Sequence, residues 1–352
     1  QSLLANVGGG TNVAIGRLAL SANTTASSNV AVGNRALYQN TTGVGNTAVG
    51  SEAMDDNITG EGNTAVGYFA LSKNTTGYYN TAIGREALES NTGIQNTAVG
   101  FRALENNTTG GDNVAIGVEA LESTTTGVKN IAMGSLAGTS STTGADNISL
   151  GWYNAYNNLT GQRNISIGTQ ALYLNTSGYF NTAIGHQALY ASTGGTNTAV
   201  GSAAGNSITT GTNNLILGYD ADASSATVSN EITLGNSSIA TLRCQVTTIT
   251  SLSDRRDKDN ITDLSAGLDF VNELRPVAFD WNMRDGGKVG QADTGFIAQD
   301  LQTAQEITGI DIPDLVYAVN PEKLEAGYGK LIPVLVKAIQ ELSAEIEALK
   351  SK

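Results

Sequence analysis

Residues Asn46 to Gly50 read N-T-A-V-G, and the same five letters return at Asn63 to Gly67. The two copies are separated by an alanine followed by a bulky apolar residue, and then by an asparagine-containing turn that ends in glycine. A repeat of 17 residues that is regular over a long stretch is typical of a solenoid, in which each unit buries its apolar side only by stacking on the next unit. This repeat therefore decides the fold of the region that contains it.

The repeat runs through most of the chain. Ten of the thirteen steps between its leading asparagines are 17 residues long and three are 16. These asparagines are Asn12, Asn29, Asn46, Asn63, Asn80, Asn96, Asn113, Asn130, Asn147, Asn164, Asn181, Asn197, Asn214 and Asn230.

The composition of one repeat favours strands over helices. Seventeen residues with two or three glycines and several Thr and Asn cannot supply the two amphipathic helices of a helical solenoid. In N-T-A-V-G, Thr47 and Val49 lie on one face of a strand and Ala48 on the other. Asn and Thr at fixed turn positions can bond to their equivalents one coil above. We predict a mainly β fold, a parallel β-roll or β-solenoid of 16- and 17-residue repeats.

Alanine recurs where a core would need bulk, at Ala31, Ala48, Ala65 and equivalent positions. We expect this face to approach another backbone closely, and a bundle of three chains would explain it. A monomeric β-solenoid is the alternative. The pattern resembles the β-roll heads of trimeric autotransporter adhesins and related phage fibre shafts, which implies a homotrimer.

Charge and composition exclude several functional classes. The net charge of -13 argues against binding to nucleic acid or an anionic membrane, because both need clustered Lys and Arg. No apolar run reaches the roughly 18 to 20 residues of a membrane span. Because Cys244 and His186 are the only residues of their types, we expect no disulfide, no metal site and no cofactor. We expect Cys244 to be a buried structural thiol and His186 to be exposed.

The composition changes abruptly near residue 253. Only 22 of the first 253 residues are charged, against 29 of the last 99, and all four prolines lie in the last part. We predict a repeat shaft over residues 1–235, a neck strand and junction over 236–253, and a small α+β domain over 254–352.

The junction sequence S-L-S-D-R-R-D-K-D-N-I spans Ser251 to Ile261. Taken alone, it could be a solvated charged linker or a helix cap. Two later blocks, G-F-I-A-Q-D-L from Gly295 and Y-G-K-L-I-P-V-L-V-K-A-I-Q-E-L from Tyr328, follow it in order. Together the three blocks resemble the intramolecular chaperone domain of phage endosialidases and tail fibres, the S74 peptidase family, over about the last 100 residues.

That resemblance implies self-cleavage by a Ser-Lys dyad, with Ser253 as nucleophile and Lys258 as general base. It places the cut between Ser253 and Asp254, and the Leu252–Ser253 bond is the alternative. A lysine can accept the serine proton only if burial or nearby positive charge lowers its pKa, and Arg256 is a candidate supporting residue. We expect this to be the chain's only enzymatic activity, with no external substrate.

The last part of the chain shows mixed patterns. Helical spacing is expected from 261 to 274, a strand from Val277 to Trp281, a turn over 285–290 and a short helix after G-F-I-A-Q-D-L. Over 331–352 we expect a C-terminal coiled-coil helix. Its apolar residues have the 3,4 spacing of a heptad seam: Ile332, Leu335, Ile339, Leu342, Ile346 and Leu349. Ile at a with Leu at d favours dimers in long coiled coils, whereas the resemblance implies a trimer.

The function expected is a structural fibre, a phage tail fibre that binds a host-surface glycan or protein receptor and releases its chaperone at Ser253. It would be part of the virion or an extracellular particle and be assembled in the host cytoplasm. The alternatives are a trimeric bacterial surface adhesin, an injection-system fibre with an uncleaved trimerisation domain, and a glycan-degrading spike with an upstream enzyme domain. Trp152, Tyr153 and Tyr156 break the repeat and are candidates for glycan contact, or they fill a widened coil or a groove between chains.

Overall fold

The computed structural model describes residues 1–239, 241–243, 253–284, 289–318 and 320–351. The chain divides into two compact units, Gln1–Asn236 and Ser237–Lys352, which we describe separately. Cys244 and most of the predicted neck strand lie outside the described residues. The described neck residues 236–239 and 241–243 form no strand.

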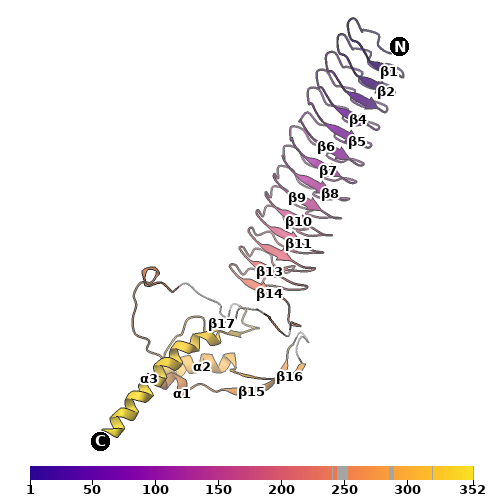
Figure 1. Cartoon of the computed structure of the whole chain (residues 1–352). Coiled ribbons are helices and arrows are strands. Elements are labelled where there is room, and N and C mark those ends of the chain that lie inside the picture. The colour runs from indigo at the N-terminus through magenta and orange to yellow at the C-terminus, as the bar shows by residue number, and fades with distance from the viewer. Residues whose placement is uncertain (240, 244–252, 285–288, 319, 352) are drawn as a thin grey trace. The chain divides into compact units, whose positions relative to one another are not determined.

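The first unit is a parallel β-solenoid in which each coil contributes one three-residue strand (Figure 1). The fourteen strands form one sheet in sequence order, and each strand pairs in parallel with the next. The strands are β1 (Val13–Ile15), β2 (Val30–Val32), β3 (Thr47–Val49), β4 (Thr64–Val66), β5 (Thr81–Ile83), β6 (Thr97–Val99), β7 (Val114–Ile116), β8 (Ile131–Met133), β9 (Ile148–Leu150), β10 (Ile165–Ile167), β11 (Thr182–Ile184), β12 (Thr198–Val200), β13 (Leu215–Leu217) and β14 (Ile232–Leu234). The predicted β-solenoid is thus confirmed.

The last coil corrects the predicted repeat by one residue. The backbone N–H of Glu231 donates to Asn214 Oδ1, the bond that the leading asparagine makes in the preceding coils. Strand β14 begins directly after Glu231 and pairs in register with β13. Asn230 occupies instead the position of Asn213 one coil earlier, and the two side chains are hydrogen bonded. Glu231 therefore replaces the leading asparagine in this coil.

The alanine face of the sheet is the inside of the coil. Ala31, Ala48 and Ala65 have no exposed surface in a single chain, whereas Thr47 and Val49 beside Ala48 face outward. The alanines pack against the Ala-Leu pairs on the opposite wall of the same coil. The expectation that alanine marks a contact between chains is therefore wrong, because the narrow coil itself leaves room for a methyl group only.

Two asparagine ladders run through the solenoid. In the first, the Asn46 N–H donates to Asn29 Oδ1 at 2.9 Å, and Asn46 Oδ1 in turn accepts from the Asn63 N–H at 2.9 Å. In the second, Asn57 Nδ2 donates to Asn40 Oδ1 at 2.8 Å and to Gly60 O at 3.1 Å. The predicted bonding between equivalent asparagines is confirmed. Threonine differs, because Thr41 Oγ1 donates to a backbone carbonyl of the next coil, that of Ile58.

Glycine after each strand allows the coils to approach. A Cβ on Gly33, whose φ is +144°, would lie 2.2 Å from the carbonyl oxygen of Gly50 in the next coil. Since no side chain fits between two backbones at that distance, the glycine of N-T-A-V-G is required by the stacking itself.

The second unit is a small α+β domain. Helix α1 (Leu268–Asn272), helix α2 (Ala298–Thr308) and helix α3 (Leu331–Lys350) accompany two antiparallel strand pairs. These pairs are β15 (Val277–Asn282) with β16 (Val289–Gly295), and β17 (Val316–Tyr317) with β18 (Glu325–Ala326). Two 3-10 turns complete the unit, η1 (Arg255–Asp257) and η2 (Tyr328–Lys330). The core contains Ala266, Phe270, Leu301, Ala304, Ile312, Leu315, Leu331 and Val334.

The sequence expectations for this unit are only partly confirmed. The strand from Val277 is present, and the C-terminal helix covers Leu331–Lys350. The short helix is present too, but it begins at Ala298, inside the G-F-I-A-Q-D-L block and not after it. The helical segment expected over 261–274 is confirmed only as α1 at Leu268–Asn272, since residues 261–267 are not helical and Leu264 is exposed. Within the predicted 285–290 turn, residues 285–288 lie outside the described part.

Helix α3 is held to α1 by a carboxylate. Glu341 accepts a hydrogen bond from the Leu268 N–H at 2.7 Å, and this bond lowers the pKa of Glu341. A Cβ on Gly267 would lie 2.2 Å from the same carboxylate, so a larger residue there would displace the Glu341 side chain. Among the described residues, no helix has the length and apolarity required to cross a membrane.

The second asparagine ladder is interrupted where another residue replaces asparagine. Thr124 occupies an asparagine position, and its hydroxyl and the Asn107 Oδ1 below it are buried without a hydrogen-bond partner among the described residues. Thr124→Asn should raise the free energy of unfolding by about 1 kcal/mol, because the new carboxamide can donate to Asn107 and to Gly127 O. Denaturant unfolding measures this change.

The control for that experiment is Thr126→Asn, which introduces the same side chain at an exposed position of the same turn. We expect Thr126→Asn to leave the stability nearly unchanged. Equal effects of the two variants, or a loss of stability in Thr124→Asn, would contradict the hydrogen-bonding role of the ladder.

Candidate self-cleavage site

The junction folds into one turn between two extended residues. Asp254 has extended dihedral angles and caps the 3-10 turn η1, since its Oδ1 accepts from the Arg256 N–H at 2.8 Å. Lys258 ends the turn in an extended conformation, and its N–H donates to the Arg255 carbonyl. The chain thus reverses within five residues and brings its two flanks together.

The turn brings the predicted nucleophile and base into contact. Lys258 Nζ donates to Ser253 Oγ at 2.6 Å. This separation is within the hydrogen-bond reach that proton transfer between a nucleophile and its base requires. The structure therefore places the two predicted dyad residues side by side, although the sequence alone says nothing about their distance.

The Arg256 side chain binds Asp254, whereas the role predicted for it is to lower the pKa of Lys258 by its positive charge. Its guanidinium binds the Asp254 carboxylate, with Nη2 to Oδ2 at 2.6 Å and Nε to Oδ1 at 3.1 Å. The side-chain bond to Arg256 lowers the pKa of Asp254, and the same bond raises the pKa of Arg256. Because the two charges neutralise each other, Arg256 supplies little net positive charge to Lys258.

The dyad is open to solvent in a single chain. Ser253 and Lys258 are both exposed. A lysine that acts as a base in proteins is normally buried or lies beside other cations. The structure thus supplies the geometry of a dyad, and any cover over it has to come from outside the described residues of one chain. Leu252, on the amino side of Ser253, lies outside the described residues.

The candidate glycan residues belong to a longer aromatic ladder. Tyr156 stacks on Tyr173 with an angle of 12° between the rings, and Tyr173 stacks on Tyr190 with an angle of 4°. Tyr153 flanks this stack, with its ring centroid 5.2 Å from that of Tyr156 and 6.3 Å from that of Tyr173. Tyr173 therefore has a stacked ring on each face, and Tyr156 has one on one face. Tyr173 and Tyr190 were missed in the sequence, although they follow Tyr156 at two successive steps of 17 residues, which indicates the same column.

Trp152 has more freedom than the tyrosines. It is 53% exposed and meets Tyr153 edge to face. Trp152 is thus the candidate glycan residue that has most surface left for a ligand. His186 is exposed, as expected.

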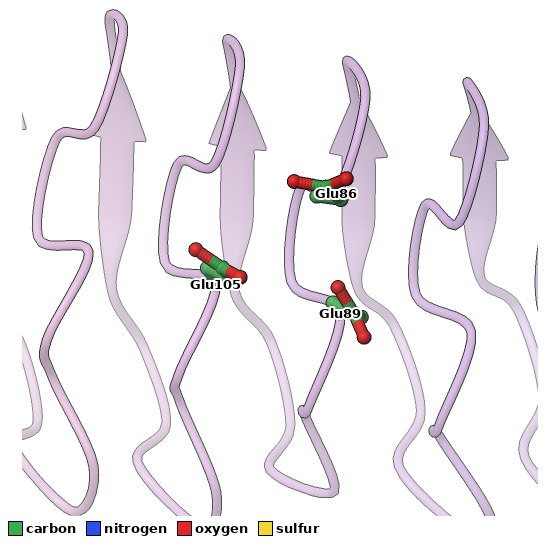
Figure 2. Close-up of side chains that lie close together, drawn as sticks. All are labelled: Glu86, Glu89 and Glu105. Carbon is green, nitrogen blue, oxygen red and sulfur yellow. The ribbon is translucent and has the colours of Figure 1, made fainter.

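Three carboxylates gather on a wall of the solenoid, at Glu86, Glu89 and Glu105 (Figure 2). These carboxylates form salt bridges with arginine and lysine side chains. Glu86 binds Arg102 Nε at 2.8 Å and Arg85 Nη2 at 2.8 Å, and Glu89 binds Lys73 at 2.7 Å. The bond from Arg102 is the main reason why the pKa of Glu86 is lowered. This arrangement forms an ion-pair network between coils.

The network predicts a pH dependence of stability. Since the folded-state pKa of Glu86 is lowered, its contribution is present above the unfolded value of about 4.3 and is lost as pH falls through the folded value. Arg102→Met should therefore lower the melting temperature at pH 7, and the difference from wild type should shrink below about pH 4. Thermal unfolding between pH 3 and pH 7 measures both effects.

Arg163→Met provides the matched control, because Arg163 pairs with Asp146 at 3.7 Å in an exposed position. Its effect at pH 7 should be smaller. A loss of stability in Arg102→Met that is the same at pH 3 and pH 7 would mean that the arginine acts through packing of its aliphatic part and not through charge.

Comparison with known proteins bears on the second unit. Neither a curated protein nor a solved structure matches the chain at a significant level. Residues 253–317 match the family model described as "Chaperone of endosialidase" (Peptidase_S74). The match starts at Ser253 and includes the G-F-I-A-Q-D-L block, whereas the block from Tyr328 lies beyond it. Residues 253–317 thus form a domain of the endosialidase-chaperone type that follows a β-solenoid.

Proposed function

We propose that the chain is the end of a homotrimeric fibre whose C-terminal domain templates assembly and is then released by self-cleavage at Ser253. The observation that carries this proposal is the family match, which begins at the residue that Lys258 contacts. A phage tail fibre in the virion, or a fibre on another extracellular particle assembled in the host cytoplasm, is the setting that fits such a domain best. Trp152 would take part in contact with a host-surface receptor.

Helix α3 supports the trimer. Its Leu331, Val334 and Ala338 are buried in the unit, whereas the heptad seam is not. The exposed fractions of the seam residues Ile332, Leu335, Ile339, Leu342, Ile346 and Leu349 lie between 43% and 68%. A 3,4-spaced apolar stripe that is separate from the helix's own core contacts is the pattern by which parallel helices associate.

The outer face of the solenoid sheet supports it as well. The third residue of every strand from β1 to β14 is Val, Ile, Leu or Met, and the parallel register aligns these residues in one column. Several are exposed in the single chain, among them Ile15, Met133 and Leu234. A continuous apolar column on a repeated surface favours a partner with the same repeat, and a second copy of the chain has it.

Such a column also creates the need for a template. If copies pair along it, a slip by one coil places each aliphatic side chain opposite another aliphatic side chain, so that the wrong register costs little. A C-terminal domain that associates first through α3 would align the chains before the shafts pair. Once the shafts are paired, removal of the domain would leave a fibre whose stability is kinetic.

The cleavage chemistry can be written with the two dyad residues. Neutral Lys258 Nζ takes the proton of Ser253 Oγ as this oxygen attacks the carbonyl carbon of the scissile bond. For the Leu252–Ser253 bond the attacking serine can belong to the same chain. For the Ser253–Asp254 bond it has to come from another copy, because attack on its own carbonyl would close a strained four-membered lactone. The C–N bond then breaks, and the leaving amine takes a proton from the Lys258 ammonium. Water hydrolyses the resulting ester and restores the serine hydroxyl. Because the dyad is exposed in one chain, we infer that assembly buries it and so sets the time of cleavage.

The cleavage is tested by intact mass and denaturing gels of freshly expressed full-length chain. Wild type should convert from 36.2 kDa to two fragments, of 253 and 99 residues if the cut follows Ser253. Ser253→Ala and Lys258→Met should remain intact, since each removes one member of the dyad. The fragment masses also decide between the two bonds that flank Ser253. Wild type that stays at full mass after assembly would rule out the self-cleavage.

The trimer is tested by native mass spectrometry of the Ser253→Ala chain. The added substitutions Ile339→Glu and Leu342→Glu should convert trimers to monomers, because they place like charges in the seam. With Ser253 intact, the same pair should also slow cleavage strongly if assembly buries the dyad.

The matched control is Gln340→Glu with Ala344→Glu, which adds the same charge at exposed positions of α3 outside the seam. We expect this control to remain trimeric and to be cleaved like wild type. A monomeric Ser253→Ala chain, or trimers that survive the seam variant, would contradict the role proposed for α3.

A further inference from the structure

One ion pair at the junction has no role in the cleavage steps described above. The Asp254 and Arg256 side chains are joined by three hydrogen bonds, although both lie at the surface of the single chain. An exposed ion pair contributes little to global stability. Its position inside the six residues that contain the dyad suggests a local purpose.

The turn sets the distance between the dyad residues. Five residue steps of extended chain would separate Ser253 and Lys258 by roughly 17 Å. Instead, the turn η1 returns the chain, and Lys258 Nζ lies 2.6 Å from Ser253 Oγ. A turn of three residues has few hydrogen bonds of its own, so its ends need other support.

The Asp254 carboxylate supports the turn by binding both the backbone and the side chain of Arg256. Its Oδ1 accepts the Arg256 N–H, a backbone group at the start of η1 that has no partner within the turn. The Arg256 guanidinium then grips the same carboxylate from its side chain. One carboxylate thus holds the backbone and the side chain of the same residue, which fixes its own rotamer and the path of the turn.

We propose that Arg256 and Asp254 form a clasp that positions Lys258 on Ser253. This inference rests on the self-cleavage proposed above and names a positioning role within it. It differs from the role expected from the sequence, in which Arg256 acts through its charge on Lys258. Arg256 touches neither the nucleophile nor the base, and it acts through the turn.

Arg256 is the better of the two residues to change, because Asp254 is itself part of one candidate scissile bond. In full-length chain, Arg256→Ala should slow the appearance of the fragments by about 100-fold, the size of effect expected when reacting groups are displaced by about 1 Å. Arg256→Lys should give an intermediate rate, because an ammonium can pair with Asp254 but cannot bind both of its oxygens in the same way.

Arg255→Ala is the matched control. Arg255 is the neighbouring cation of the same turn, and it makes no ion pair with any residue that the structure describes. Its backbone carbonyl, which accepts from the Lys258 N–H, is retained in the variant. We expect Arg255→Ala to be cleaved at nearly the wild-type rate.

The pH profile separates positioning from a charge effect. If the clasp positions the dyad, Arg256→Ala lowers the rate by the same factor at every pH. If Arg256 acted by favouring the neutral form of Lys258, its loss would shift the profile to higher pH and the full rate would return there. A shifted profile, or equal rates for Arg256→Ala and Arg255→Ala, would overturn the proposal.

Hydrogen exchange of the uncleaved Ser253→Ala chain tests the clasp independently of cleavage. The amides of Arg256, Asp257 and Lys258 are hydrogen bonded in the turn and should be protected. Adding Arg256→Ala should speed their exchange, and adding Arg255→Ala should not. If Arg256→Ala loses protection but the wild-type chain is never cleaved, the clasp is supported and the self-cleavage is refuted. Unchanged protection would refute the clasp alone.

Discussion

The whole solenoid depends on one constraint: the backbone of each coil must hydrogen bond to the backbone of the next coil, at the spacing of adjacent strands. Every position of the repeat then faces its own equivalent. Where two backbones meet, only glycine fits, as at Gly33 against Gly50. Where polar side chains turn inward, the same type must recur, since Asn57 is satisfied by Asn40 below it. Repetition in the sequence is thus the direct result of repetition in the hydrogen bonding.

That constraint also explains why the two units have such different compositions. A stack of near-identical coils gains its specificity from hydrogen bonds along one chain, and it carries almost the same side chains at every level of its outer column. It therefore contains little information about where a second chain should begin. The C-terminal unit has what the shaft lacks, namely distinct helices, a compact core around Phe270 and one seam on α3. Under the proposed function, register is encoded once, in the part whose sequence does not repeat.

The period and the alternation predict the solenoid well, because each is enforced in every coil. The wrong predictions arise where the outcome depends on strand register or packing, which the sequence pattern does not show. Asn230 matches the motif, yet register assigns the position to Glu231, which can receive the same backbone bond. The small size of alanine indicates a close neighbour but not whether it belongs to the same chain. Helical spacing over 261–274 gives a helix only from Leu268 to Asn272. The dyad residues were named from the sequence, whereas the pairing of Arg256 with Asp254 required coordinates, since Asp257 and Asp259 also lie within three positions of Arg256.

At the junction, the placement of Lys258 on Ser253 and the activation of Lys258 as a base have different physical origins. Under the proposed function, nucleophile, base and clasp all lie within Ser253 to Lys258, so that the contact between Lys258 and Ser253 is made by one local turn. A site of this kind can form early in every copy of the chain. If geometry were sufficient, cleavage would precede assembly and the template would be lost too soon. The exposure of the dyad removes this conflict, because a hydrated lysine remains a poor base however well it is placed. Positioning can then be local and permanent, while the control of timing is left to whatever surface covers the turn when the chains come together.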